Sequence, residues 1–271
     1  MQVRFPQFDL ASSVAQWGGN AEAVTVVNAG GIIPAAIEGY MIRVMRRAKQ
    51  LLDPVADADL LADIDLFSKQ EGQHLKVHNA YLAMLRDGGY PRIGEFAAAF
   101  AADLDGFLDN EDLAWNLGYS EGFESVGSAM ASAWVDGQIK DLCGDDGSVP
   151  MQVWMWHLAE EFEHRSVVHD VMHRLYGPER ALELRTAGSD FGRSHFGDHA
   201  ALAAAYMFEV DRVAMPSAQV AESLQREEAA WLGLGLAAGD ALNAVYRPDY
   251  DPRSIATPRD YDAVLERFTS V

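Results

Sequence analysis

Apolar residues recur at the spacing of α-helices along most of the chain. Ile37, Met41 and Met45 keep this spacing after Pro34, and because proline is favoured in the first turn of a helix, we predict a helix over 34–52. The same spacing predicts further helices over 57–86, 93–108, 111–140, 151–176, 178–187, 200–213, 219–245 and 261–268. Residues 1–33 are mixed in character and predict at most a short helix. The pattern therefore indicates an all-α protein.

Segments containing glycine or proline separate these helices and predict turns or loops. They lie at 53–54, 88–91, 143–150 and 177–178, and Gly233, Gly235 and Gly239 interrupt the helix over 219–245. The helix over 93–108, rich in alanine and phenylalanine, is predicted to cross the others. We predict one domain over 1–271, with a four-helix core over about 34–176 and accessory helices over about 178–271.

Charge, cysteine content and apolar runs limit the partners and the cellular compartment that we expect for this chain. The chain of 271 residues has 41 acidic and 21 basic residues, a formal net charge of -20, which makes nucleic acid and anionic membrane surfaces unfavourable partners. The single cysteine, Cys143, excludes an intrachain disulfide and suits a reducing compartment. We find no signal peptide and no apolar run near the roughly 20 residues that span a bilayer. These features predict a soluble cytoplasmic protein.

Candidate metal ligands lie in the segment WMWHLAEEFEHRSVVHD, residues 154–170. His157, Glu161 and His164 are spaced i, i+4 and i+7, so their side chains share one face of a helix. The alternative is a solvated, charge-rich helix in which Glu161 pairs with Arg165 at i+4. This segment taken alone leaves both interpretations open.

A second segment, FSKQEGQHLKVH, repeats the pattern with Glu71, His74 and His78 on one helix face. Two Glu-x-x-His motifs on separate helices, with a single glutamate from each of two other helices, are the ligand set of a dinuclear iron or manganese site in a four-helix bundle. On the first helix Glu38 has only apolar neighbours at i+3 and i+4; the alternative is that it reaches water. On the third helix, spacing favours neither Glu121 nor Glu124.

The segments NAGGIIPAAIEGY, FSKQEGQHLKVH, YSEGFES and WMWHLAEEFEHRSVVHD resemble the bacterial family described as predicted metal-dependent hydrolases, a group of ferritin-like helical proteins. The resemblance covers roughly 20–180 and continues more faintly around 246–252. It implies metal ligation by Glu71, His74, Glu121, Glu161 and His164, with His78 and His157 as extra histidines that either ligate or support the ligands.

Two departures from the family pattern concern the single-glutamate helices. Pro34 lies four residues before Glu38, where the family commonly has three, and Gly122 follows Glu121 where a histidine is common. The spacing His157-x-x-x-Glu161-x-x-His164 also resembles the last helix of the para-aminobenzoate N-oxygenase group of diiron enzymes.

Other polar residues near these segments are not predicted ligands. We expect Glu160 and Glu163 to face solvent and His169 and His173 not to bind metal. His195 and His199 lack a carboxylate in phase and are predicted to lie at the surface or in a loop. Aromatic residues near the ligand stripes are expected to be core, or else to line a substrate pocket; they are Tyr40, Phe67, Tyr119, Phe123, Trp154 and Trp156.

The sequence therefore predicts a ferritin-like four-helix bundle with additional peripheral and C-terminal helices. Carboxylate and imidazole ligands suit iron or manganese better than structural zinc. We predict a non-haem oxygenase with two iron ions that uses dioxygen to oxidise a small organic substrate, with an electron donor such as a ferredoxin or reductase; a homodimer is left open. The alternatives are a dinuclear metal-dependent hydrolase and a ferritin-like iron-handling protein. The sequence does not identify the substrate.

Overall fold

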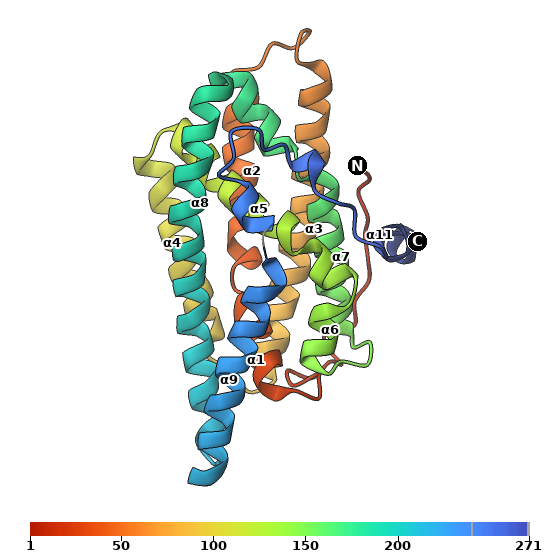
Figure 1. The fold of residues 1–271 in the computed structure, drawn as a ribbon, viewed down its shortest axis with the longest axis vertical. Coiled ribbons are helices and arrows are strands. Elements are labelled where there is room, and N and C mark those ends of the chain that lie inside the picture. The colour runs from red at the N-terminus through yellow and green to blue at the C-terminus, as the bar shows by residue number, and fades with distance from the viewer. Residues whose placement is uncertain (240, 270–271) are drawn as a thin grey trace.

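The computed structural model describes residues 1–239 and 241–269, and these residues form α-helices, one 3-10 turn and connecting segments (Figure 1). No strand occurs in the described part of the chain, so the prediction of an all-α helical bundle is confirmed. Residue 240, within the predicted helix over 219–245, and residues 270–271 at the end of the predicted accessory region lie outside the described residues.

Four long helices form the bundle: α2 (Pro34–Lys49), α3 (Ala58–Asp87), α5 (Leu113–Val135) and α7 (Val149–His164). Polar side chains cap the N-terminal ends of two of these helices, α5 and α7. The Asp112 side chain accepts a hydrogen bond from the Trp115 amide at 2.8 Å, and the Ser148 side chain accepts one from the Met151 amide at 3.2 Å. Each cap satisfies an amide that a helix start leaves unpaired.

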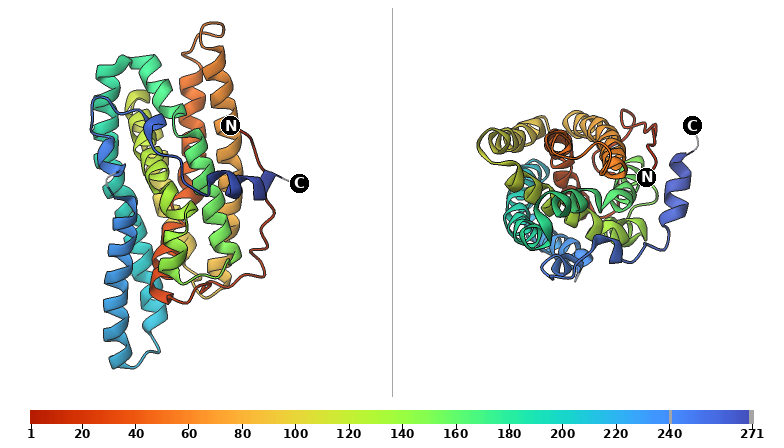
Figure 2. Two further views of the ribbon diagram at one scale, coloured as in Figure 1. Left: turned by 45° about the vertical axis from the view of Figure 1, so that its right-hand side comes forward. Right: turned by 90° about the horizontal axis from the view of Figure 1, so that it is seen from above.

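The remaining helices surround this bundle (Figures 1 and 2). They are α1 (Ala21–Gly30), α4 (Ile93–Asn110), α6 (Gln138–Cys143), α8 (Val167–Arg212), α9 (Ser217–Ala238), α10 (Ala241–Ala244) and α11 (Tyr261–Thr269), with the 3-10 turn η1 at Pro252–Ser254. α4 packs on α2, whereas α8 lies along α5 and α9 runs back beside α8 and α1. The C-terminal α11 packs on the outer side of α7.

Glycines allow α5 and α8 to approach each other closely. A Cβ added to Gly188 would lie 1.8 Å from the backbone oxygen of Gly118, and one added to Gly122 would lie 2.5 Å from that of Gly188. Side chains at these positions would force the two helices apart. This contact holds α8 against the back of the bundle helix that carries Glu121 and Glu124.

Two predicted helices end earlier than expected. The helix predicted over 111–140 ends at Val135 because Gly137, with φ of 89°, starts the separate helix α6. The helix predicted over 151–176 breaks after His164, and α8 begins at Val167. The break therefore falls directly after the Glu-x-x-His motif, a position that local sequence did not indicate.

The C-terminal half is more continuously helical than predicted. The break predicted at 177–178 is present, because Gly177 has a non-helical φ of 75° and ψ of 167° within α8; the helices predicted over 178–187 and 200–213 form one continuous helix from there to Arg212. His195 and His199, predicted to lie at the surface or in a loop, therefore lie on a helix and are partly buried. The interruptions expected at Gly233 and Gly235 do not occur, because α9 runs unbroken to Ala238.

Residues Ala21–Lys49, covering α1 and α2, are long and apolar enough to qualify as a membrane span by length and composition. This stretch departs from the prediction that the chain has no apolar run near the length that spans a bilayer. Most of its apolar window is buried inside the protein, since Val24, Ile37 and Met41 are fully inaccessible to solvent. The stretch therefore has the character of a core helix, in which apolar residues pack against other helices.

Candidate metal centre

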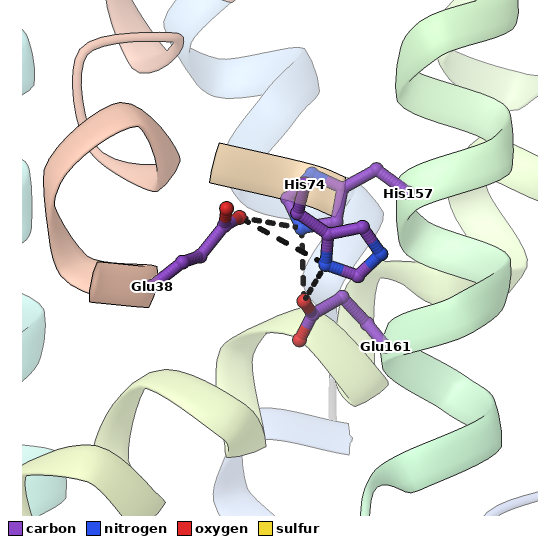
Figure 3. Close-up of side chains that lie close together, drawn as sticks. All are labelled: Glu38, His74, His157 and Glu161. Carbon is purple, nitrogen blue, oxygen red and sulfur yellow. Dashed lines mark hydrogen bonds and ion pairs between the residues drawn. The ribbon is translucent and has the colours of Figure 1, made fainter. Parts of the chain in front are cut away.

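Two groups of buried side chains meet in the middle of the bundle and share one residue. The first group is Glu38, His74, His157 and Glu161, shown in Figure 3, and the second is Glu71, Glu161 and His164. Within each group, one potential ligand atom from every residue lies within 4.8 Å of the others. The shared residue is Glu161.

In the first group, the imidazole nitrogens face two carboxylates. His157 Nε2 lies 2.8 Å from Glu161 Oε1 and 3.2 Å from Glu38 Oε1. His74 Nδ1 lies 3.5 Å from Glu161 Oε1 and 4.0 Å from Glu38 Oε1. Four donor atoms from α2, α3 and α7 therefore converge on one small volume (Figure 3).

In the second group, His164 Nε2 is the central donor. It lies 3.2 Å from Glu71 Oε1, 3.5 Å from Glu161 Oε2 and 3.6 Å from Glu124 Oε2. Glu161 thus directs Oε1 toward the first group and Oε2 toward the second. A carboxylate whose two oxygens face two donor groups has the arrangement of a bridging ligand between two metal ions.

The helices account for this geometry. On α3, Glu71 and His74 lie one turn apart, and on α7 the same spacing joins Glu161 and His164, so each helix contributes one pair to the same volume. α2 adds Glu38 and α5 adds Glu124, which are single glutamates on the two other bundle helices. This distribution matches that of dinuclear carboxylate sites in four-helix bundles.

The donor atoms are buried and lack partners. Neither oxygen of Glu38, Glu71 or Glu124 has a hydrogen-bond partner among the described residues, and the same holds for His74 Nδ1 and His164 Nε2. Unpaired polar atoms in a protein interior are costly and rare. Two divalent cations would satisfy these atoms together, so the residues present fit a dinuclear metal site.

Burial perturbs the pKa values of these groups. It raises the pKa of Glu38 and Glu124 well above the ordinary range, and the nearby Glu161 carboxylate raises both further. Burial also opposes ionisation of Glu161, yet the surrounding histidines, His164 foremost, hold its pKa well below the ordinary value. Burial together with nearby His74 lowers the pKa of His157 to about 4, so its imidazole is neutral at physiological pH and free to ligate.

Each histidine in the two groups is held through its other ring nitrogen. His74 Nε2 lies 3.0 Å from Glu160 Oε2, and His164 Nδ1 lies 3.1 Å from Gln70 Oε1. His157 Nδ1 lies 2.7 Å from Nε2 of His78. Partners of this kind orient histidine ligands and fix the tautomer that leaves the ligating nitrogen free. His78 therefore lies behind His157 and not among the converging donor atoms.

The structure corrects the predicted exposure of two glutamates. Glu160 is fully buried; it forms a hydrogen bond with His74 and accepts one from Arg4 at 2.9 Å. Glu163 is mostly buried and accepts hydrogen bonds from Arg4 and Gln70. The N-terminal segment that carries Arg4 covers this face of α7. Local sequence held no signal for this contact because Arg4 is more than 150 residues away.

On α5 the structure separates the two candidate glutamates. Glu124 lies beside His164, whereas Glu121 Oε1 is 3.1 Å from Nδ1 of His169, one turn away from the converging donors. One sequence signal favours Glu124. Gly127 lies one turn later on α5 and leaves room for Glu161, since a Cβ there would be 2.7 Å from Glu161 Oε2.

The alternative in which Glu161 lies at the surface and pairs with Arg165 is not observed. The Glu161 side chain is buried, and Arg165 donates hydrogen bonds to the backbone oxygens of Pro252 and Phe162. Both predicted roles, core packing and lining of a pocket, occur among the aromatic residues near the ligand stripes. Phe123 and Trp154 line a cavity, whereas Tyr40, Phe67, Tyr119 and Trp156 are buried core.

That cavity, of about 370 Å³, reaches the first donor group. Its ionisable lining residues are His157, Glu161 and Arg193, and nearly all the rest of the described lining is apolar. The apolar residues include Val26, Ile33, Phe123, Met130, Trp134 and Trp154. A small, largely apolar molecule in this cavity would contact the side of the site formed by His157 and Glu161.

A comparison with protein families agrees with this geometry. The model of the family described as "Predicted metal-dependent hydrolase" matches residues 2–256, nearly the whole chain. The protein belongs to this family. The resemblance inferred from the sequence is thereby confirmed, while similarity to the N-oxygenase group is not. No curated protein and no solved structure matches the chain significantly.

The family description bears on the type of reaction. It supports the hydrolytic alternative better than the oxygenase predicted from the sequence. Together with the two donor groups, membership in the predicted metal-dependent hydrolase family indicates a metal-dependent enzyme.

Proposed function

We propose that this member of the predicted metal-dependent hydrolase family holds two metal ions and acts on a small, largely apolar organic molecule. The observation that carries the proposal is the placement of Glu161, whose two oxygens face different donor groups. One ion would be held by Glu38, His74 and His157 and the other by Glu71, Glu124 and His164, with Glu161 between them. Glu124 replaces Glu121 in this assignment.

The donor atoms limit the identity of the metal. All of them are carboxylate oxygens or imidazole nitrogens, and the single cysteine is not among them. Such donors suit iron or manganese, whereas structural zinc sites favour four ligands, often with thiolates. We therefore propose iron or manganese as the resident metal.

The first candidate reaction is hydrolysis, which the family description supports. Two bound divalent ions would supply a water of lowered pKa and polarise the bond to be cleaved. The chain's own contribution is positioning: the apolar cavity orients the substrate, and His78 keeps His157 in place through Nδ1. Arg193 on the cavity wall offers a cation for a polar end of the substrate.

A second candidate, oxidation of the substrate by dioxygen with two iron ions, is favoured by the ligand pattern. Two Glu-x-x-His pairs with two single glutamates form the set found in carboxylate-bridged diiron proteins of this architecture. The mainly apolar lining of the cavity also suits exclusion of water from an oxidation. This reaction would require an electron donor such as a ferredoxin or a reductase.

The test begins with metal analysis of protein purified from cells supplied with iron or manganese. Two iron or manganese ions per chain are expected in the wild type and fewer than one in Glu161→Gln, with helix content retained. Glu183→Gln, an exposed glutamate on α8, is the matched control and should keep both ions. Two ions in the Glu161 variant would overturn the proposed site.

The reaction is then assigned with the loaded protein. Hydrolysis predicts turnover of apolar ester or amide substrates that does not depend on dioxygen. Oxidation predicts that anaerobically reduced, iron-loaded protein consumes dioxygen and shows a transient absorbing species. Manganese or iron binding with dioxygen consumption but without ester or amide turnover would move oxidation to first place.

A further inference from the structure

A third group of ligand-type side chains lies outside the bundle centre, between α4 and α8. Asp103 on α4 faces His195 and His199 on α8, and one donor atom from each lies within 4.8 Å of the others. Asp103 Oδ2 is 3.2 Å from His195 Nε2 and 2.9 Å from His199 Nε2. Asp103 belongs to a different helix from the two histidines, so the local sequence around His195 and His199 does not indicate this contact.

The three donors have the composition of a transition-metal site. Two imidazoles and one carboxylate are a common set of three protein ligands for zinc, with water in the fourth position. The histidine side chains are 12% and 15% exposed and Asp103 is 51% exposed, so the group opens to solvent on one side. A cation could enter directly and keep a water ligand.

Residues around the group hold the two histidine rings in place. His195 Nδ1 lies 2.7 Å from the hydroxyl of the buried Tyr119, so this contact orients the ring and leaves Nε2 facing Asp103. The ring of Phe100 packs against both histidines, with centroids 5.2 Å from His195 and 5.0 Å from His199. A metal-binding histidine is usually held in place by a hydrogen bond to the ring nitrogen that does not bind the metal.

Electrostatics also suit a cation. Asp103 supplies a carboxylate that faces Nε2 of both His195 and His199. One carboxylate and two imidazoles would then bind the cation and leave one coordination position open to water.

We propose that Asp103, His195 and His199 form a divalent cation site, best suited to zinc, that fastens α4 to α8. The site is separate from the bundle centre and shares no residue with it. α4 is a peripheral helix, and an ion bound here would connect it to the helix that supports α5 while one position stays open to water. The competing explanation is a simple ion pair between Asp103 and a protonated histidine.

Zinc binding distinguishes these explanations. Zinc is titrated into full-length protein in competition with a chromophoric chelator, comparing wild type with His199→Ala and Asp103→Asn. The wild type should bind one more zinc ion per chain than either variant, whatever the bundle centre takes up. Asp105→Asn, which removes an exposed carboxylate two residues along α4, should bind as much as the wild type. Equal stoichiometry in wild type and His199→Ala would overturn the proposal.

A second measurement tests the role of Tyr119. Tyr119→Phe removes only the hydroxyl beside His195, and loss of such a partner lowers metal affinity by roughly 10- to 100-fold. A purely packing role would change the melting temperature of the zinc-free protein and leave zinc affinity intact. Zinc should raise the melting temperature of the wild type by more than that of His199→Ala. Unchanged zinc affinity in Tyr119→Phe would contradict the proposed support of His195.

Discussion

Gly127→Ala should weaken metal binding while changing the stability of the metal-free protein little, because the added methyl group displaces Glu161 but also favours the helix. Gly127 lies on α5 opposite the shared carboxylate, and an added Cβ would lie 2.7 Å from Glu161 Oε2. Ordinary contact begins at 3.4 Å, so the carboxylate must move by the difference, about 0.7 Å. Metal-ligand distances tolerate only about 0.2 Å. The substitution should therefore displace the proposed bridging ligand from both ions.

The expected loss is a reduction in affinity for both ions of roughly 10- to 100-fold, the range produced when support of a metal ligand is lost. Stability of the metal-free protein should change little. Alanine favours a helix over glycine by about 1 kcal/mol, which offsets part of the cost of moving Glu161. Hence the free energy of unfolding of the metal-free variant should lie within about 1 kcal/mol of the wild type.

Gly72→Ala on α3 is the matched control, since nothing lies within 4 Å of the added Cβ. It should stabilise the protein by up to about 1 kcal/mol and leave metal binding unchanged. The assays are chelator competition for metal affinity and urea unfolding, followed by circular dichroism, for stability. Wild-type affinity for both ions in Gly127→Ala would refute the bridging role of Glu161, and an equal loss in Gly72→Ala would show that the effect is not local.

Three further predictions test contacts around the site and between helices. Glu160→Gln weakens the support of His74 and should lower metal affinity by roughly 10- to 100-fold, measured by chelator competition; no change would remove Glu160 from the site. Gly188→Ala should destabilise the protein by about 3 kcal/mol in urea unfolding, because its Cβ would lie 1.8 Å from a backbone oxygen of α5; wild-type stability would contradict the close packing of α5 and α8. The hydrogen bond from Arg226 holds the pKa of Glu22 below 4.5, so this pair contributes stability above that pH and loses it as pH falls through the lowered pKa. Arg226→Ala should therefore lower the free energy of unfolding slightly at pH 7 and progressively less below pH 4.5, measured by urea unfolding across pH; a loss independent of pH would exclude this origin.

Much of the site follows from local sequence. Helical periodicity places Glu71 with His74, and Glu161 with His164, on common helix faces, since residues three apart lie one turn along the helix. The apolar neighbours of Glu38 likewise indicate that its helix face is buried. These inferences need only the geometry of single helices, and for this reason the all-α bundle and the paired ligand stripes could be predicted without tertiary structure.

Tertiary packing decided which residues meet across helices. The rotation of α5 against α7 brings Glu124, and not Glu121, beside His164, and the N-terminal segment carries Arg4 to the buried Glu160. Asp103 meets the two histidines of α8 in the same way. Helix periodicity sets the relative directions of side chains within one helix, but not how two helices are rotated and shifted against each other. Those quantities depend on side-chain packing over whole interfaces, including the close contact of α5 with α8, and so only the folded structure determines them.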